Sequence, residues 1–121
     1  MYSESLLALR DVLDKRLEYL EVTNDKFHKN MQEVGLLKFK DNADIVAMQS
    51  QMSLNNSVFE RNQKEIKEIL ASLAKFESGI YGICEMCEGE IGIERLQSKP
   101  HSKFCIDCRE IYEKSEKQKE R

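Results

Sequence analysis

The sequence contains no tryptophan and only one proline among its 121 residues. Charged residues account for 34% of the chain and hydrophobic residues for 40%. Few prolines leave helices uninterrupted, and the scarcity of bulky apolar residues argues against a thick globular core. The composition therefore favours long solvated helices. The length predicts one domain, or one small domain with an extension.

The sequence also lacks a strong positive charge and a long apolar run. Its formal net charge is −3 and its pI is about 5.5. Proteins that bind nucleic acid on their own usually carry a basic face, so this balance argues against such a binder while leaving room for a local patch. No apolar stretch approaches the length that spans a membrane, and we find no secretory signal. We therefore expect a soluble, cytoplasmic protein. We also expect a monomer without sequence-specific DNA binding.

Three common arrangements of catalytic residues are missing as well. The sequence has no glycine-rich phosphate loop, no Ser/His/Asp set and no cysteine beside a candidate base. These absences predict that the protein is not an enzyme.

The only cysteines form two C-x-x-C pairs, Cys84 with Cys87 and Cys105 with Cys108, separated by seventeen residues. Two intervening residues let one tight turn direct both sulfurs of a pair at a single ion. A loop that returns the second pair then completes a tetrahedral thiolate shell. Because protein ligands fill all four positions, no water can be activated. The spacing predicts one structural Zn²⁺ ion held by the four cysteines.

Two other interpretations compete with zinc. Four cysteines can form two disulfides, and a C-x-x-C pair can be a redox centre. Without a secretory signal or a βαβ setting, we rank both lower. His101 lies inside the loop and could replace a cysteine as ligand, but with four cysteines available we expect a surface histidine. We expect His28, within a helical run, to be solvated.

Apolar residues recur at steps of three and four in two stretches. The first predicts a helix from about Ser3 to Val34, with Ser3 or Ser5 as N-cap. The second predicts a helix from about Asp44 to Glu77 with an unbroken heptad pattern. Two stripes of similar length joined by a short link predict an antiparallel coiled-coil hairpin. Polar residues within the seam lower its stability and can fix its register; they are Asn24, Asn55 and Asn62.

The link between these helices combines capping and apolar residues. Gly35 suits the end of the first helix. Asp41, Asn42 and Asp44 are all good N-caps for the second, and this is the simplest interpretation of the two aspartates. Capping leaves the apolar residues nearby unexplained, because little core is available at the end of a long arm. They suggest a docking tip near residues 35–46, and include Leu36, Leu37, Phe39, Ile45 and Val46.

Beyond Phe76, Gly79 and Gly82 mark the change from helix to the cysteine region. A third helix is expected from near Cys105 toward Lys119. The predicted fold is thus dominated by α-helix: a coiled-coil arm over residues 1–78, then a zinc-finger region with a C-terminal helix over residues 79–121. We expect a small core around the metal, made of Ile83, Ile91, Ile93, Leu96 and Phe104.

The cysteine region resembles the zinc-finger signature of the DksA/TraR family. The matching residues read Cys84-x-x-Cys87-x-x-x-Ile91-x-x-x-Arg95-Leu96-x-x-x-Pro100-x-x-x-x-Cys105-Ile106-Asp107-Cys108. The preceding hairpin, with Asp41 and Asp44 at its turn, is similar to the coiled-coil arm of this family. The resemblance covers nearly the whole chain.

This resemblance implies a transcription regulator. Members of the family bind bacterial RNA polymerase, insert the arm into its secondary channel and modulate initiation at ribosomal RNA and stringent-response promoters, together with the alarmone ppGpp. By motif match, Asp44 is the key acidic tip residue, Asp41 supports it and Val46 belongs to the tip. Lys99 and Arg109 fall where ppGpp-binding residues are expected.

The sequence departs from the family pattern at three positions. Val46 stands where many members have alanine, and Asn42 where proline is common. On the second helix, Glu68 occupies an expected basic position, with Lys67 beside it. A carboxylate there repels a polyphosphate.

Other functions remain alternatives. Gre transcript-cleavage factors also carry a coiled-coil arm with an acidic tip, but they lack the four-cysteine region. A generic zinc-ribbon adaptor or nucleic-acid-binding module is disfavoured by the acidic pI. Oxidation of the zinc thiolates would add redox regulation to the leading hypothesis.

Overall fold

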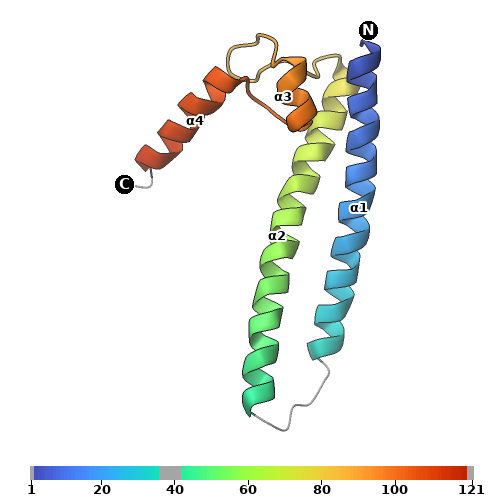
Figure 1. Ribbon diagram of the computed structural model, residues 1–121, viewed down its shortest axis with the longest axis vertical. Coiled ribbons are helices and arrows are strands. Elements are labelled where there is room, and N and C mark those ends of the chain that lie inside the picture. Colours follow the sequence, from blue (N-terminus) through green and yellow to red (C-terminus); the bar gives the residue numbers. More distant parts are fainter. Residues whose placement is uncertain (1, 36–41, 120–121) are drawn as a thin grey trace. The chain divides into compact units, whose positions relative to one another are not determined.

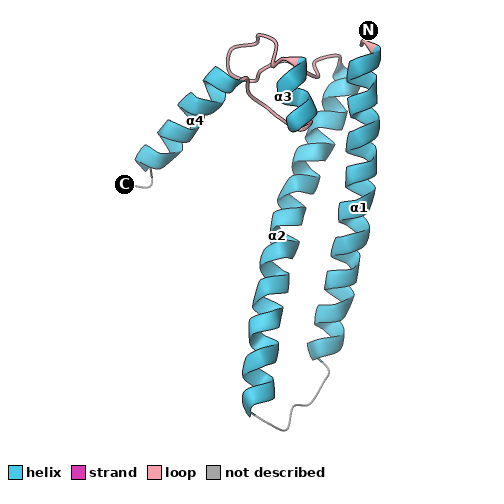
Figure 2. Ribbon diagram, viewed as in Figure 1, coloured by secondary structure: helices cyan, strands magenta, loops and turns pink. Residues whose placement is uncertain are grey.

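The computed structural model describes residues 2–35 and 42–119, apart from the side chains of 31–35, 42–45, 47–49, 51, 118 and 119. It contains four helices (Figures 1 and 2): α1 (Glu4–Gly35), α2 (Asn42–Ser78), α3 (Ile93–Ser98) and α4 (Ile106–Lys119). This described part contains no β-strand, only an isolated antiparallel bridge between Ile83 and Glu90. The predicted fold class, a long helical hairpin followed by a cysteine region and a C-terminal helix, is confirmed.

The chain divides into two compact units. The base unit contains the residues up to Lys15 and those from Glu68 onward, and the arm unit is Arg16–Lys67. The base unit thus groups one end of each long helix with the cysteine region. From the sequence we placed the domain boundary at residue 78, where the second long helix gives way to a loop. That boundary stays a prediction.

Hydrogen bonds of a buried polar residue connect the two helices of the arm unit. Leu20 and Asn24 are its fully buried residues among those whose side chains are described. Asn24 donates a hydrogen bond to the Phe59 carbonyl (3.1 Å) and accepts one from Asn62 (3.0 Å). The prediction that asparagines interrupt the apolar seam is therefore confirmed for this pair.

An aromatic cluster organises the core of the base unit. The rings of Phe76 and Tyr81 stack with centroids 3.9 Å apart, and the Tyr2 ring meets the Phe76 ring edge-on at 5.0 Å. The Tyr2 hydroxyl donates to the Lys75 carbonyl and accepts a hydrogen bond from the Tyr81 backbone N–H. Burial raises the pKa of Tyr81 to about 12, and its hydroxyl donates to the Pro100 carbonyl (2.8 Å). The cluster therefore joins the start of α1, the end of α2 and the returning loop.

Helix α2 ends in a Schellman motif. The Ile80 N–H donates to the Lys75 carbonyl and the Gly79 N–H donates to the Phe76 carbonyl. Gly79 has φ +76°, a backbone conformation that glycine adopts without strain. The prediction that Gly79 ends the helix is confirmed.

Most predicted helix ends agree with the structure. Helix α1 begins at Glu4, and the Ser3 side chain caps it by accepting a hydrogen bond from the Leu6 N–H. Helix α2 begins at Asn42, so Asp44 is its third residue and the capping interpretation of Asp44 is wrong. Asn42, also proposed as a cap, is the first residue of the helix, and Asp41 lies outside the described residues.

Two features of the cysteine region were not anticipated correctly. Helix α3 was not predicted, because its six residues are too few to show a helical period. Ile93 was expected in the core but is exposed, since it is the first residue of this short helix. Ile91 and Leu96 are buried as predicted, and Ile83 and Phe104 are half-buried. Among the described helices, none combines the length and apolar character needed to cross a membrane.

Replacing Leu13 by alanine should destabilise the protein by about 2–5 kcal/mol, because the side chain is 1% exposed and its loss leaves a cavity. Leu7 lies on the same helix but is 46% exposed, so Leu7→Ala should change stability by less than about 1 kcal/mol. Urea unfolding of the zinc-loaded variants measures both values. Equal losses would contradict the core assignment.

Candidate metal centre

The four cysteines converge in the base unit. Their sulfur atoms all lie within 4.8 Å of one another, and those of Cys87 and Cys105 are 3.9 Å apart. All four are free thiols, so the two-disulfide interpretation is wrong. Cys84 and Cys108 are buried, Cys105 is half-buried and Cys87 is exposed. Four thiol ligands around one point match the donor set of a structural zinc site.

Backbone hydrogen bonds shape the turn that presents the first pair. The Cys84 N–H donates to the Gly89 carbonyl (2.8 Å), and the Glu88 N–H donates to the Cys84 carbonyl (3.0 Å). The Ile91 N–H donates to the Gly82 carbonyl (2.8 Å), next to the bridge between Ile83 and Glu90. The turn is therefore closed by the backbone at both ends.

The returning loop and α4 present the second pair. Cys105 immediately precedes α4, and Cys108 lies in its first turn. The Glu85 N–H donates to the Lys103 carbonyl (2.9 Å) and ties the two cysteine segments together. The Arg95 side chain of α3 donates to the Phe104 carbonyl (2.9 Å). Two segments far apart in sequence are thus joined independently of the metal.

The electrostatics of the cluster favour a cation. Burial raises the pKa of the Cys84 thiol, but hydrogen bonds from backbone N–H groups lower it more, and the pKa falls from 9.0 to about 6. These N–H groups belong to Cys87, Cys105 and Met86. The pKa of Cys108 rises to about 12, chiefly because its thiol hydrogen-bonds to Cys105 and also because it is buried. The two pKa values shift in opposite directions, and a divalent cation held by the sulfurs would favour the thiolate form of both.

His101 is not part of the cluster. The group of metal-ligating side chains found among the described residues consists of the four cysteines alone. His101 Nδ1 lies 3.0 Å from Glu68 Oε2, and its side chain is only 14% exposed. Both the alternative of a histidine ligand and the expectation of a surface histidine are therefore wrong. The pair connects the returning loop to α2.

Another ion pair near the site was missed from the sequence. Lys75 Nζ lies 3.1 Å from Glu85 Oε1, and the Lys75 side chain is 13% exposed. The pair connects the last turn of α2 to the residue after Cys84. No sequence pattern indicated it, because the partners are ten positions apart and the connecting chain leaves the helix.

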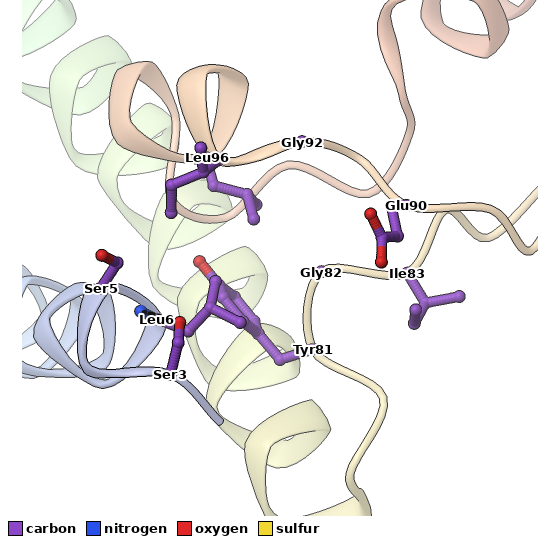
Figure 3. Close-up of a pocket in the computed structure, with 10 residues that line it drawn as sticks. Ser3, Ser5, Leu6, Tyr81, Gly82, Ile83, Glu90, Gly92 and Leu96 are labelled. Carbon is purple, nitrogen blue, oxygen red and sulfur yellow. Dashed lines mark hydrogen bonds between the residues drawn. The ribbon is translucent and has the colours of Figure 1, made fainter. Parts of the chain in front are cut away.

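A separate cavity of about 370 Å³ opens in the base unit (Figure 3). Figure 3 shows Leu6, Tyr81 and Leu96 around it, with Glu90 at one side. Its lining contains one carboxylate and no lysine or arginine. This cavity therefore does not suit a polyphosphate, and neither Lys99 nor Arg109 lines it.

The other predicted site residues occupy different places. Val46 is 61% exposed on α2. Lys99 caps the end of α3, and Arg109 lies on α4 with its side chain 2.7 Å from Glu113. Both basic residues are half-buried members of the base unit.

Comparison with known proteins identifies the family. Residues 79–114 match the family model described as prokaryotic dksA/traR C4-type zinc finger. The chain is 33% identical over 118 residues to the RNA polymerase-binding transcription factor DksA of Haemophilus influenzae, covering 98% of this chain and 81% of the relative. The protein belongs to the DksA/TraR family. The same-named protein of Escherichia coli is 35% identical over 118 residues, covering 98% of this chain and 78% of that protein.

Solved structures support this membership. Transcription factor DksA2 from Pseudomonas aeruginosa superposes with a TM-score of 0.79 at 25% identity, over 93% of this chain and 86% of that one. The family's C4-type zinc finger and the clustered cysteines agree on the cofactor, one structural Zn²⁺ ion. The four sulfurs would fill its coordination shell, and the ion would join the two cysteine segments.

The turn after Cys87 stores backbone strain. Glu88 has φ +63°, a region that costs a non-glycine residue about 1–2 kcal/mol. Glu88→Gly should therefore stabilise the zinc-loaded protein by about 0.5–1 kcal/mol, after allowing for the greater flexibility of glycine in the unfolded chain. Glu90→Gly, a nearby exposed position without positive φ, should destabilise it. Chemical unfolding compares the two variants, and a loss of stability in Glu88→Gly would contradict the strain.

Zinc retention should fall steeply with acidification. Above a pH of about 6 the Cys84 thiol is ionised, and as pH falls through this value a proton competes with the metal for its sulfur. Each thiol that must lose a proton weakens zinc binding by up to about tenfold per pH unit. Competition with a chromogenic chelator from pH 8 to pH 5 measures the effect. A pH-independent zinc affinity would argue against thiolate coordination.

Proposed function

We propose that this protein binds bacterial RNA polymerase and modulates transcription initiation. The observation that carries the proposal is the extent of the similarity, which covers 98% of the chain and so includes the helical arm as well as the zinc finger. Both relatives are named RNA polymerase-binding transcription factors. Binding to polymerase would place the protein in the cytoplasm, and we expect it to act as a monomer.

In this proposal the arm enters the secondary channel of the polymerase with the link between α1 and α2 in front. Asp44 lies in the first turn of α2, where the helix dipole favours a negative charge. An acidic residue at this position of the helix is therefore favourable. We assign Asp44 the main contact with polymerase, with Asp41 in support. Val46, exposed on the same helix, would supply an apolar contact.

We further propose that Lys99 and Arg109 contact ppGpp. Two observations bear on the strength of this contact. The Arg109 guanidinium already pairs with Glu113 at 2.7 Å, and the Glu68 carboxylate lies 3.0 Å from a histidine that offsets its charge only when protonated. Because carboxylates repel a polyphosphate, we expect ppGpp to enhance the activity without being essential to it.

The proposed regulator acts without chemistry of its own. Four cysteine ligands leave zinc no open position for a reacting water. The relatives are named transcription factors, in agreement with a non-catalytic role.

Asp44→Asn tests the proposed tip. Asparagine keeps the size of the side chain and removes its charge, so the variant should still bind polymerase while its inhibition of a ribosomal RNA promoter falls on the order of tenfold. Multi-round transcription in vitro, with and without ppGpp, measures the inhibition. Asp14→Asn makes the same charge change at an exposed position of α1 in the base unit and should behave like the original protein.

Two results would contradict the proposal. Failure of the original protein to bind core polymerase at low salt would remove polymerase as the partner. If the original protein and Asp44→Asn both bind but neither alters transcription, the tip does not modulate initiation. Transcript cleavage in backtracked complexes then becomes the function to assay.

A further inference from the structure

The described core of the arm unit is thin, and polar side chains form hydrogen bonds between its two helices. Among its described side chains, Leu20 and Asn24 are the fully buried ones. Beyond Asn24 toward the α1–α2 link, Phe27, Met52 and Asn55 are half-buried. Half-buried apolar side chains permit neighbouring helices to slide or separate more readily than close-packed ones. Apolar packing alone therefore does not fix how α1 and α2 align in this part of the arm unit, and other contacts must do so.

The Asn24 side chain supplies such contacts. Its amide nitrogen donates to the Phe59 carbonyl at 3.1 Å, and its amide oxygen accepts from the Asn62 side chain at 3.0 Å. Both ends of the amide are used, and the side chain is 4% exposed. Sliding α2 by one turn would leave this buried amide without its partners, which is unfavourable. The bonds therefore favour a single alignment of α1 and α2.

A second polar contact between the two helices favours the same alignment. Arg16 donates from Nε to Glu65 Oε2 at 2.7 Å and from Nη2 to Glu65 Oε1 at 3.4 Å. The hydrogen bond to Glu65 raises the pKa of Arg16. Both side chains contact solvent, so this link is weaker than the buried amide layer. Its paired geometry is nevertheless specific for one register.

We propose that Asn24, with Asn62 and the Phe59 carbonyl, forms a layer of positioning residues that keeps the two arm helices in register. The layer would fix how the helix ends at Gly35 and Asn42 face each other, and so how Asp44 and Val46 are presented to the partner. This inference takes one element from the proposed function, namely that the partner is RNA polymerase.

The double variant Asn24→Leu/Asn62→Leu separates register from stability. Two leucines extend the apolar seam, so the melting temperature should stay the same or rise, whereas a merely stabilising role of the asparagines predicts a fall. Helix alignment is measured by electron–electron dipolar spectroscopy between labels at Glu18 and Ser53, two exposed positions of the arm unit. Labels attached through unnatural ketone side chains leave the zinc cysteines untouched. Asn56→Leu, which adds leucine at an exposed position, is the matched control.

We expect the distance distribution to broaden or shift in the double variant and to stay narrow in the original protein and in Asn56→Leu. Inhibition of transcription should fall at least threefold while polymerase binding persists. An unchanged distribution would overturn the register role, and an altered distribution with full inhibition would overturn the positioning role. If the original protein does not act on polymerase, the proposed function fails, and the spectroscopy alone still decides whether the layer sets the register.

Discussion

The repulsion among four closely spaced cysteine sulfurs is the constraint on which the base unit depends. Sulfurs within 4.8 Å of one another cannot all be thiolates unless a cation lies between them. The raised pKa of Cys108, whose thiol hydrogen-bonds to Cys105 and is buried, is consistent with this crowding. The four cysteines would hold a zinc ion as thiolates, and its positive charge would offset their repulsion. Backbone hydrogen bonds and the buried side chains of Tyr81, Ile91 and Leu96 already hold the loops that carry the cysteines, and a zinc ion would add a further link between them.

Contacts around the metal link this centre to the helices. Lys75 reaches from α2 to Glu85, and Tyr81 joins the end of α2 to the returning loop through its ring and its hydroxyl. These contacts explain why the ends of both long helices belong to the same compact unit as the cysteine region.

The arm unit follows a different principle. It contains no clustered cysteines, and its described core is thin. Hydrogen bonds between specific side chains, rather than close packing of apolar side chains, therefore determine how its helices align. An amide that uses both its donor and its acceptor in a buried seam distinguishes registers that an apolar seam treats as similar. For a protein proposed to act through the end of a long arm, alignment matters more than maximal stability.

The sequence by itself determined the features that depend on local spacing. The cysteine pairs indicated the metal, the heptads indicated the two long helices, and Gly79 indicated where the second one ends. These signals are readable because each depends on residues a few positions apart. Helix α3 escaped because it is too short to show a period.

The tertiary structure alone decided how distant segments meet. It placed His101 against Glu68 instead of the metal, left Ile93 exposed, and joined Asn24 to Asn62. The sequence showed which of these residues are polar and which are apolar, but not what they contact. The partners of His101 and Asn24 lie 33 or more positions away in the chain. Such pairings follow from the path of the whole chain, which brings together side chains that no local pattern relates.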